Sequence, residues 1–183
     1  VLYFHKDTLL IFKNVSSNIV AKLIKKKCFQ DIEFDNLPFA QDWNITYKVL
    51  SRINKVYFLN EGLYNYWYRK GSTSDFKEKE VIKSLIMVED SFCKIKKAYE
   101  KNDNEKLPLC LNYLKVKLIV GLMNRSRFID TKYRKKYQLG LWKRNKSSLN
   151  FKGLSKFWPW WKIIVIKLFL YKPSYFHMKK FSK

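Results

Sequence analysis

The stretch AQDWNITYKVL, residues 40–50, combines an acidic residue with apolar residues that recur every three or four positions. This spacing predicts an amphipathic helix from Asp42 to about Ile53. Its apolar sector is broad, so we expect the helix to be wedged between other elements. Asp is also a favoured N-cap residue, because its carboxylate accepts hydrogen bonds from the N–H groups of the first turn. Asp42 therefore has a purely structural explanation, as a helix cap.

Short β-prone runs lie on either side of a turn downstream of this helix. KVYFLN (55–60) and LYNYWY (63–68) are rich in β-branched and aromatic residues, which predicts two strands. The basic loop RKGSTS (69–74) follows and is typical of a solvated turn. Upstream of the helix, DIEFD (31–35) alternates acidic and apolar residues, which predicts a solvated strand edge.

Longer helices are predicted in the rest of the chain. Apolar residues at helical spacing predict helices over 77–101 and 107–128, and a basic helix follows around 130–146. We therefore expect an α/β N-terminal portion, followed by a mostly α-helical, basic C-terminal portion. The expected division is residues 1–76, a helical extension over 77–152, and a basic aromatic amphipathic tail over 153–183.

Charge is distributed unevenly along the sequence. The 183 residues include 38 Lys and Arg and 15 Asp and Glu, which gives a net charge of +23. Residues 101–183 hold 21 of the basic residues and 3 of the acidic ones, and Asp130 is the only acid after Leu107. Such an excess indicates an anionic partner for this half, either phospholipid head groups or nucleic acid phosphates.

Cysteine and histidine residues show no pattern typical of a metal site. Cys28, Cys93 and Cys110 are far apart and form no C-x-x-C pair, so neither a disulfide framework nor a zinc ribbon is expected. His5 and His177 lie at opposite ends of the chain. The sequence therefore predicts no metal site, and reduced thiols in a cytoplasmic setting.

Four segments, taken in order, resemble the C-terminal half of the catalytic domain in family 2 glycosyltransferases with the GT-A fold. These are bacterial inverting sugar transferases of capsule and lipopolysaccharide assembly. The matching segments are AKLIKKKCF (21–29), QDW (41–43), NKVYFLNEGLYNYWYR (54–69) and GSTS (71–74). The resemblance implies that residues 1–76 are the C-terminal part of a GT-A catalytic domain, an incomplete Rossmann-like α/β fold.

The family's nucleotide-binding half has no counterpart in these 183 residues. That half carries an Asp-x-Asp that binds Mg²⁺ or Mn²⁺ together with the donor diphosphate in a complete family member. The 41 residues before Asp42 contain no Asp-x-Asp. The resemblance therefore implies a C-terminal fragment that holds no cofactor and is inactive alone.

Particular residues acquire roles from the resemblance. Asp42 matches the family's catalytic base, which takes the proton of the acceptor hydroxyl as that oxygen attacks the anomeric carbon of a nucleotide-sugar. Trp43 would stack on an acceptor sugar, although packing explains it equally well. Four residues would lie near the donor diphosphate, which their hydrogen-bond donors suit: Arg69, Lys70, Ser72 and Ser74. The implied substrates are a nucleotide-sugar donor and a lipid-linked or saccharide acceptor.

The tail over 154–181, LSKFWPWWKIIVIKLFLYKPSYFHMKKF, interleaves Trp, Phe and Ile with Lys. Such segments lie in the membrane interface, with rings at head-group depth and ammonium groups near anionic lipid. This predicts a protein peripheral to the inner face of the cell membrane. A basic helix that packs its aromatic face on the rest of the chain explains the same pattern.

Two other classes of protein compete with this interpretation. Basic residues interleaved with aromatics also suit single-stranded nucleic acid, but no RNP-like, KH or helix-turn-helix pattern is present, so nucleic acid is the less expected partner. A non-catalytic interaction domain is the other alternative, in which Asp42 would have no chemical role.

Overall fold

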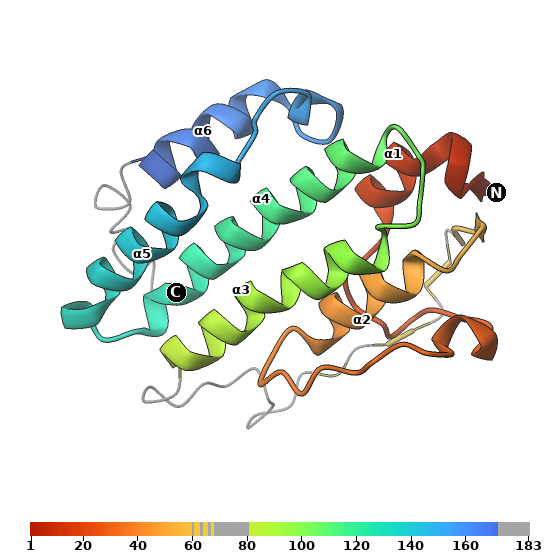
Figure 1. Ribbon diagram of the computed structural model, residues 1–183, viewed down its shortest axis with the longest axis horizontal. Helices are drawn as coiled ribbons and strands as arrows, with labels where there is room; N and C mark the ends of the chain where they lie inside the picture. Colours follow the sequence, from red (N-terminus) through yellow and green to blue (C-terminus); the bar gives the residue numbers. More distant parts are fainter. Residues whose placement is uncertain (60, 63, 66, 68–80, 172–183) are drawn as a thin grey trace. The chain divides into compact units, whose positions relative to one another are not determined.

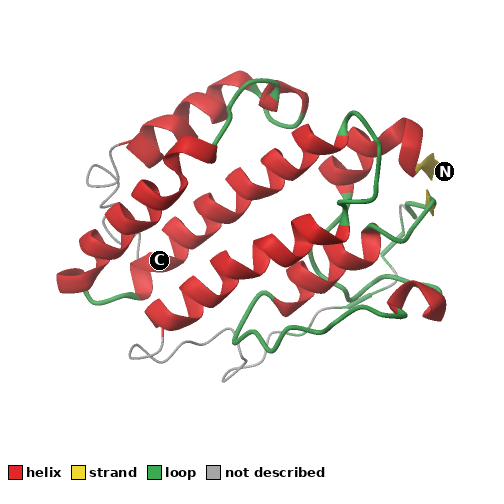
Figure 2. Cartoon of the chain, in the orientation of Figure 1, coloured by secondary structure: helices red, strands yellow, loops and turns green. Residues whose placement is uncertain are grey.

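The computed structural model describes residues 1–59, 61–62, 64–65, 67 and 81–171 (Figure 1). Most of these residues lie in helices, and the strands are confined to two short pieces (Figure 2). The chain divides into two compact units, Val1–Leu111 and Asn112–Lys183. The sequence predicts a division into three parts by their expected roles, and these two compact units do not test that division.

In the first unit, three helices surround a core of aromatic side chains. They are α1 (Phe4–Asn14), α2 (Gln41–Leu50) and α3 (Val81–Ala98), and a short 3-10 helix, η1, spans Lys26–Phe29. Helices α2 and α3 pack side by side (Figure 1). Strands β1 (Leu2–Tyr3) and β2 (Lys55–Val56) pair antiparallel, with Leu2 opposite Val56.

The prediction of an incomplete GT-A, Rossmann-like α/β N-terminal portion is wrong. In the described residues, the only sheet is the two-stranded pair of β1 and β2. The β-prone run over 55–60 is paired only at Lys55 and Val56, and Tyr57 and Leu59 are each 67% exposed. A strand is stabilised by its neighbours, and this run has a partner only two residues long.

The second predicted strand, over 63–68, is described only in part. Tyr64, Asn65 and Trp67 lie outside any strand, and the other residues of this run are outside the described part of the chain. Trp67 is 80% exposed. High β propensity therefore does not by itself place these three described residues in a strand.

The core of the first unit is an aromatic cluster shared by its three helices. Phe12 of α1 and Tyr47 of α2 are fully buried, with ring centroids 5.9 Å apart. The Tyr99 hydroxyl, just after α3, donates to the Tyr47 carbonyl at 2.7 Å. Phe4 stacks on Tyr99 at 6.3 Å. These contacts tie the start of the chain to α2 and α3 through side chains that bury large apolar areas.

The second unit consists of the larger part of α4 (Leu107–Arg125) and the elements after it. They are η3 (Ser126–Phe128), α5 (Thr131–Asn145), η4 (Lys146–Ser148), η5 (Leu154–Lys156) and α6 (Trp160–Tyr171). The helices predicted over 77–101, 107–128 and 130–146 are confirmed as α3, α4 and α5. The apolar residues of α3 recur at helical spacing along the whole helix, which is a reliable local signal.

Polar contacts organise the loops of the second unit. Asp130, its only acid, is the N-cap of α5 and accepts a hydrogen bond from the Lys132 backbone N–H at 2.9 Å. The Lys115 ammonium donates to the Ser148 hydroxyl at 2.7 Å. The Tyr113 ring is stacked on Phe157 at 4.2 Å, which holds the segment before α6 against α4. The single carboxylate of this unit is thus already engaged in a structural role.

One helical stretch in the described residues, Leu107–Phe128, is long and apolar enough to cross a membrane. The core helix of a soluble protein has the same length and composition, and 44% of the most apolar part of this stretch is buried within the protein. The finding is therefore weak evidence for a membrane span.

Replacement of Phe12 by Ala tests the aromatic core. Phe12→Ala removes a fully buried ring from α1, so we expect the free energy of unfolding to fall by about 3–5 kcal/mol. Leu10→Ala, on the same helix at a side chain that is 48% exposed, should cost less than about 1 kcal/mol. Urea unfolding followed by circular dichroism measures both, and equal losses would show that the rings are not the core.

Candidate functional site

Asp42 lies in the first turn of α2, one residue after the helix begins. The helix starts at Gln41, and its N-cap is Ala40, with φ 59° and ψ 23° and no capping side chain. The prediction that Asp42 is the N-cap residue is therefore wrong. A carboxylate in the first turn still interacts favourably with the partial positive charge of the helix N-terminus. The structural explanation of Asp42 is thus weaker than the sequence suggested, since it provides no cap.

The surroundings of Asp42 differ from those of the rest of its helix. Asp42 is half-buried, whereas every residue from Trp43 to Leu50 is buried. This confirms that the helix is wedged between other elements. Among the described residues, the Asp42 carboxylate makes no hydrogen bond and no ion pair. It therefore remains available to a hydroxyl group from outside.

The charge of Asp42 affects the pKa of one basic residue, Lys22. Burial lowers the pKa of the Lys22 ammonium, and the negative charge of Asp42 opposes that shift. Lys22 also donates a hydrogen bond to the Asn18 carbonyl. The segment AKLIKKKCF (21–29), which belongs to the resemblance, thus brings a basic residue to the side of the candidate base.

Trp43 is a packing residue in this structure. Its side chain is buried, its ring meets Tyr47 edge-on at 5.9 Å, and it lies 6.5 Å from the ring of Phe92. Through these contacts the Trp43 ring joins α2 to α3. A role for Trp43 in stacking on an acceptor sugar stays a prediction. Arg69, Lys70, Ser72 and Ser74, the residues predicted near a donor diphosphate, lie outside the described residues.

The structure contains an ion-pair cluster of Asp35, Lys48 and Lys94, which the sequence did not predict. The Lys48 ammonium donates to the Asp35 carboxylate at 2.7 Å and to the Glu33 carbonyl at 2.9 Å. Lys94 of α3 binds the other Asp35 oxygen at 2.5 Å. Both side chains of the Lys48–Asp35 pair are nearly inaccessible, at 7% and 5% exposure. The prediction that 31–35 is a solvated strand edge is therefore wrong at Asp35, which lies outside any strand.

This cluster fixes the chain that leads into the candidate site. Asp35 is joined to α2 through Lys48 and to α3 through Lys94. Two residues further on, the Leu37 carbonyl accepts a hydrogen bond from the Gln41 side chain at 2.7 Å. The segment that leads to Ala40 and Asp42 is thus fixed at Asp35 and again at Leu37. No local pattern could have revealed this, because Asp35 and Lys48 are far apart in sequence.

Other features of the described residues do not converge on Asp42. No group of three His, Cys, Asp or Glu side chains there is placed to hold a metal ion, and the sequence expectation about metals stays a prediction. A shallow pocket of about 460 Å³ is lined by His5 and residues 101–106. Neither Asp42 nor Trp43 lines it.

Comparison of the chain with known proteins leaves its family open. No protein-family model, no curated protein and no solved structure matches it. The resemblance to family 2 glycosyltransferases therefore continues to rest on the order and spacing of the segments between residues 21 and 74.

Removal of the Asp35 carboxylate tests the ion-pair cluster. Burial alone would raise the pKa of Asp35, but the hydrogen bonds and charges of Lys48 and Lys94 outweigh it, so the pKa lies below the ordinary 3.8. Asp35→Asn leaves Lys48 buried without its partner, and we expect a loss of about 3–5 kcal/mol in unfolding free energy at neutral pH. Glu33→Gln is the control, because Glu33 is 76% exposed and its ion pair should contribute less than about 1 kcal/mol.

The pH dependence of stability gives a second measurement on the same variants. Around pH 3.8 the unfolded chain binds more protons at Asp35 than the folded chain does. Asp35 therefore makes its full contribution to the free energy of unfolding at higher pH. This contribution is lost as the pH falls through the lower pKa of the folded state. Urea unfolding at several acidic pH values should show a steep loss for the wild type and a smaller one for Asp35→Asn. The same slope in both proteins would contradict this assignment.

Proposed function

We propose that this chain supplies the general base and part of the acceptor side of an inverting, nucleotide-sugar-dependent glycosyltransferase of cell-surface polysaccharide or lipopolysaccharide synthesis. The observation that carries the proposal is the half-buried Asp42 carboxylate at the open end of an otherwise buried helix, inside the ordered series of segments. The helical fold around it is compatible with this role, because the base needs only a fixed position beside the acceptor.

The proposed reaction moves one proton and exchanges one bond. The Asp42 carboxylate accepts the proton of an acceptor hydroxyl while that oxygen forms a bond to the anomeric carbon of the donor sugar. The bond from this carbon to the nucleoside diphosphate breaks on the opposite face, so the configuration inverts. The leaving diphosphate carries the electron pair and needs cationic partners, a role proposed for Arg69 and Lys70 with the hydroxyls of Ser72 and Ser74.

Support for a fixed base comes from the contacts behind α2. A general base is effective only when its oxygen lies within about 2.6–3.2 Å of the hydroxyl oxygen whose proton it takes, so its helix must not shift. Lys48 is joined to Asp35, and the Tyr47 carbonyl accepts the Tyr99 hydroxyl, so α2 is tied to the neighbouring segment and to α3. The Mg²⁺ or Mn²⁺ of a complete family member would act at the donor diphosphate, and no step above depends on it.

A cytoplasmic location belongs to the same proposal. All three cysteines are free thiols, which suits a reducing compartment. The alternative is a non-catalytic interaction domain, for which the Asp42 carboxylate would be dispensable. Activity measurements on a charge-neutral variant distinguish the two.

Asp42→Asn is the decisive variant for catalysis. The amide has nearly the same size but cannot accept the proton, so we expect turnover to fall by about 10²–10⁴-fold with the fold unchanged. The measurement is release of nucleoside diphosphate by the protein expressed from its complete reading frame. The donors are UDP-glucose, UDP-galactose and UDP-N-acetylglucosamine, with bacterial membranes as the source of acceptor.

Asp31→Asn is the matched control. Asp31 is exposed and has a φ of 57°, a conformation that Asn tolerates well, so this substitution also removes one charge without strain. It should leave turnover unchanged. The proposal fails if Asp42→Asn and Asp31→Asn are equally active, or if the wild type releases no nucleoside diphosphate from any of the donors.

A further inference from the structure

Helix α6 presents an apolar face that no other described element covers. Five of its side chains are between 44% and 70% exposed: Trp160, Trp161, Ile164, Val165 and Leu168. Isolated apolar residues on a surface are ordinary, but five on one short helix form a contiguous patch. Large exposed patches of this kind mark interaction sites.

The arrangement of lysines around this face is regular. Each residue advances about 100° around a helix, so the five exposed apolar side chains share a sector of about 140°. Lys162 lies about 60° beyond one border of the sector and Lys167 about 20° beyond the other. Between the two lysines, on the opposite side, are Ile163 and the buried Ile166. The helix thus has an inner apolar face, an outer apolar face, and a lysine at each boundary.

The inner side of α6 is anchored to the second unit. Ile166 is 6% exposed, and Phe157, just before the helix, is stacked on Tyr113 at 4.2 Å. The ring of Trp158 meets Tyr113 edge-on at 4.8 Å. The expectation that the tail packs an aromatic face on the rest of the chain therefore describes the inner side of the segment. It does not account for the outer face.

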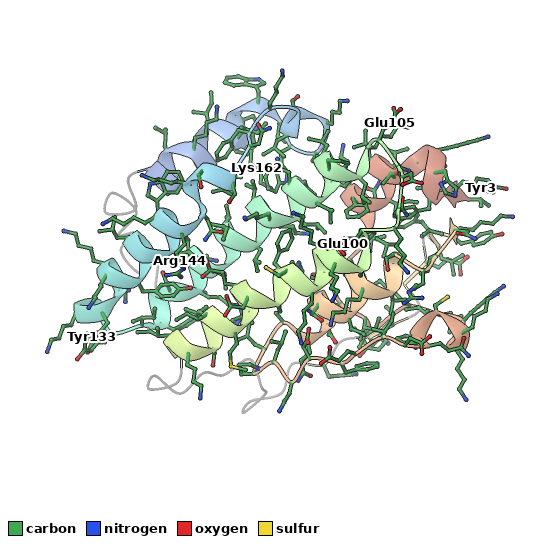
Figure 3. The ribbon with its side chains drawn as sticks, viewed as in Figure 1. Tyr3, Glu100, Glu105, Tyr133, Arg144 and Lys162 are labelled. Atoms are coloured by element: carbon green, nitrogen blue, oxygen red, sulfur yellow. The ribbon has the colours of Figure 1, made fainter. Side chains whose placement is uncertain are left out.

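The two lysines are held at the borders by aromatic rings. The Lys162 ammonium lies 5.4 Å from the ring of Trp158, and Lys162 is seen on α6 in Figure 3. The Lys167 ammonium lies 5.3 Å from the ring of Phe151. Neither lysine has an acidic partner in the described residues. The two lysines thus flank the outer face, and no carboxylate of the described residues neutralises them.

The charge of the second unit favours an anionic surface. Residues 112–183 contain 19 Lys and Arg and one acid, Asp130, which already caps α5. A second copy of the chain is a poor occupant for the outer face, because two units of this charge repel one another. Nucleic acid is also a poorer fit, since bases stack on aromatic rings and three of the five side chains in the sector, Ile164, Val165 and Leu168, are aliphatic.

We propose that the outer face of α6 docks in the interface of an anionic lipid bilayer, with the helix axis parallel to the membrane plane. The helix has 12 residues and is about 18 Å long, shorter than the hydrocarbon core of about 30 Å, so it lies on the membrane and does not span it. The side chains of Trp160 and Trp161 enter the head-group region, and Lys162 and Lys167 contact lipid phosphates. This proposal does not depend on Asp42 or on glycosyl transfer.

Vesicle flotation with a matched pair of variants tests the docking face. Leu168→Glu places a charge in the centre of the outer face, where Leu168 is 56% exposed, and Leu139→Glu makes the same change at a 45% exposed site on α5. With vesicles of equal parts phosphatidylcholine and phosphatidylglycerol at physiological salt, we expect Leu168→Glu to weaken binding about tenfold or more. Leu139→Glu should bind like the wild type, and vesicles of phosphatidylcholine alone should bind all proteins weakly.

Trp161→Ser provides a second, uncharged variant, and circular dichroism checks that each variant is folded. Its expected effect is also a clear loss of vesicle binding. Equal loss in Leu168→Glu and Leu139→Glu would overturn the proposal, as would equal binding of the wild type to neutral and anionic vesicles. It would also be overturned if the wild type bound a single-stranded oligonucleotide and not vesicles, or formed a dimer that Leu168→Glu dissociates.

Discussion

The burial of Lys48 against Asp35 is the contact on which the first unit depends. Helix α2 is buried from Trp43 to Leu50, and a buried lysine in its last turn is tolerated only if a carboxylate meets it. Asp35 satisfies this requirement and also binds Lys94 of α3. One carboxylate therefore joins a loop and two helices. The hydrogen bond from the Tyr99 hydroxyl, just after α3, to the Tyr47 carbonyl adds a second buried link to α2.

The position of the candidate base follows from the same constraint. The buried pair holds Asp35, and the hydrogen bond from Gln41 holds Leu37, so the chain enters α2 along a defined path. Ala40 completes this path in a left-handed conformation that costs a non-glycine residue about 1–2 kcal/mol. Strain of this kind persists where surrounding contacts impose it, and it is common beside functional residues. The contacts of the preceding segment and those of α2 together fix the position of Asp42.

In the second unit the governing constraint is the near absence of negative charge. Asp130 caps α5, and the sequence of the unit contains no other Asp or Glu to pair with its positive side chains. Several cluster against aromatic rings, as Lys162 and Lys167 do, and burial lowers the pKa of Lys117, with the charge of Lys162 adding to that shift. Such a unit gains stability from any anionic surface that lies against it.

Features that depend on near neighbours along the chain could be predicted from the residues alone. The helices α3, α4 and α5 and the wedged position of α2 could be predicted, because the contacts that form a helix are local. The fold class could not be predicted in this way, since the β-prone run over 55–60 needed a distant partner and met only two residues of β1. The three-dimensional structure was needed to show that the Asp35 side chain is buried, that the N-cap of α2 is Ala40 and not Asp42, and that the outer side of α6 is uncovered. Each of these depends on contacts between residues far apart in sequence, which no local pattern encodes.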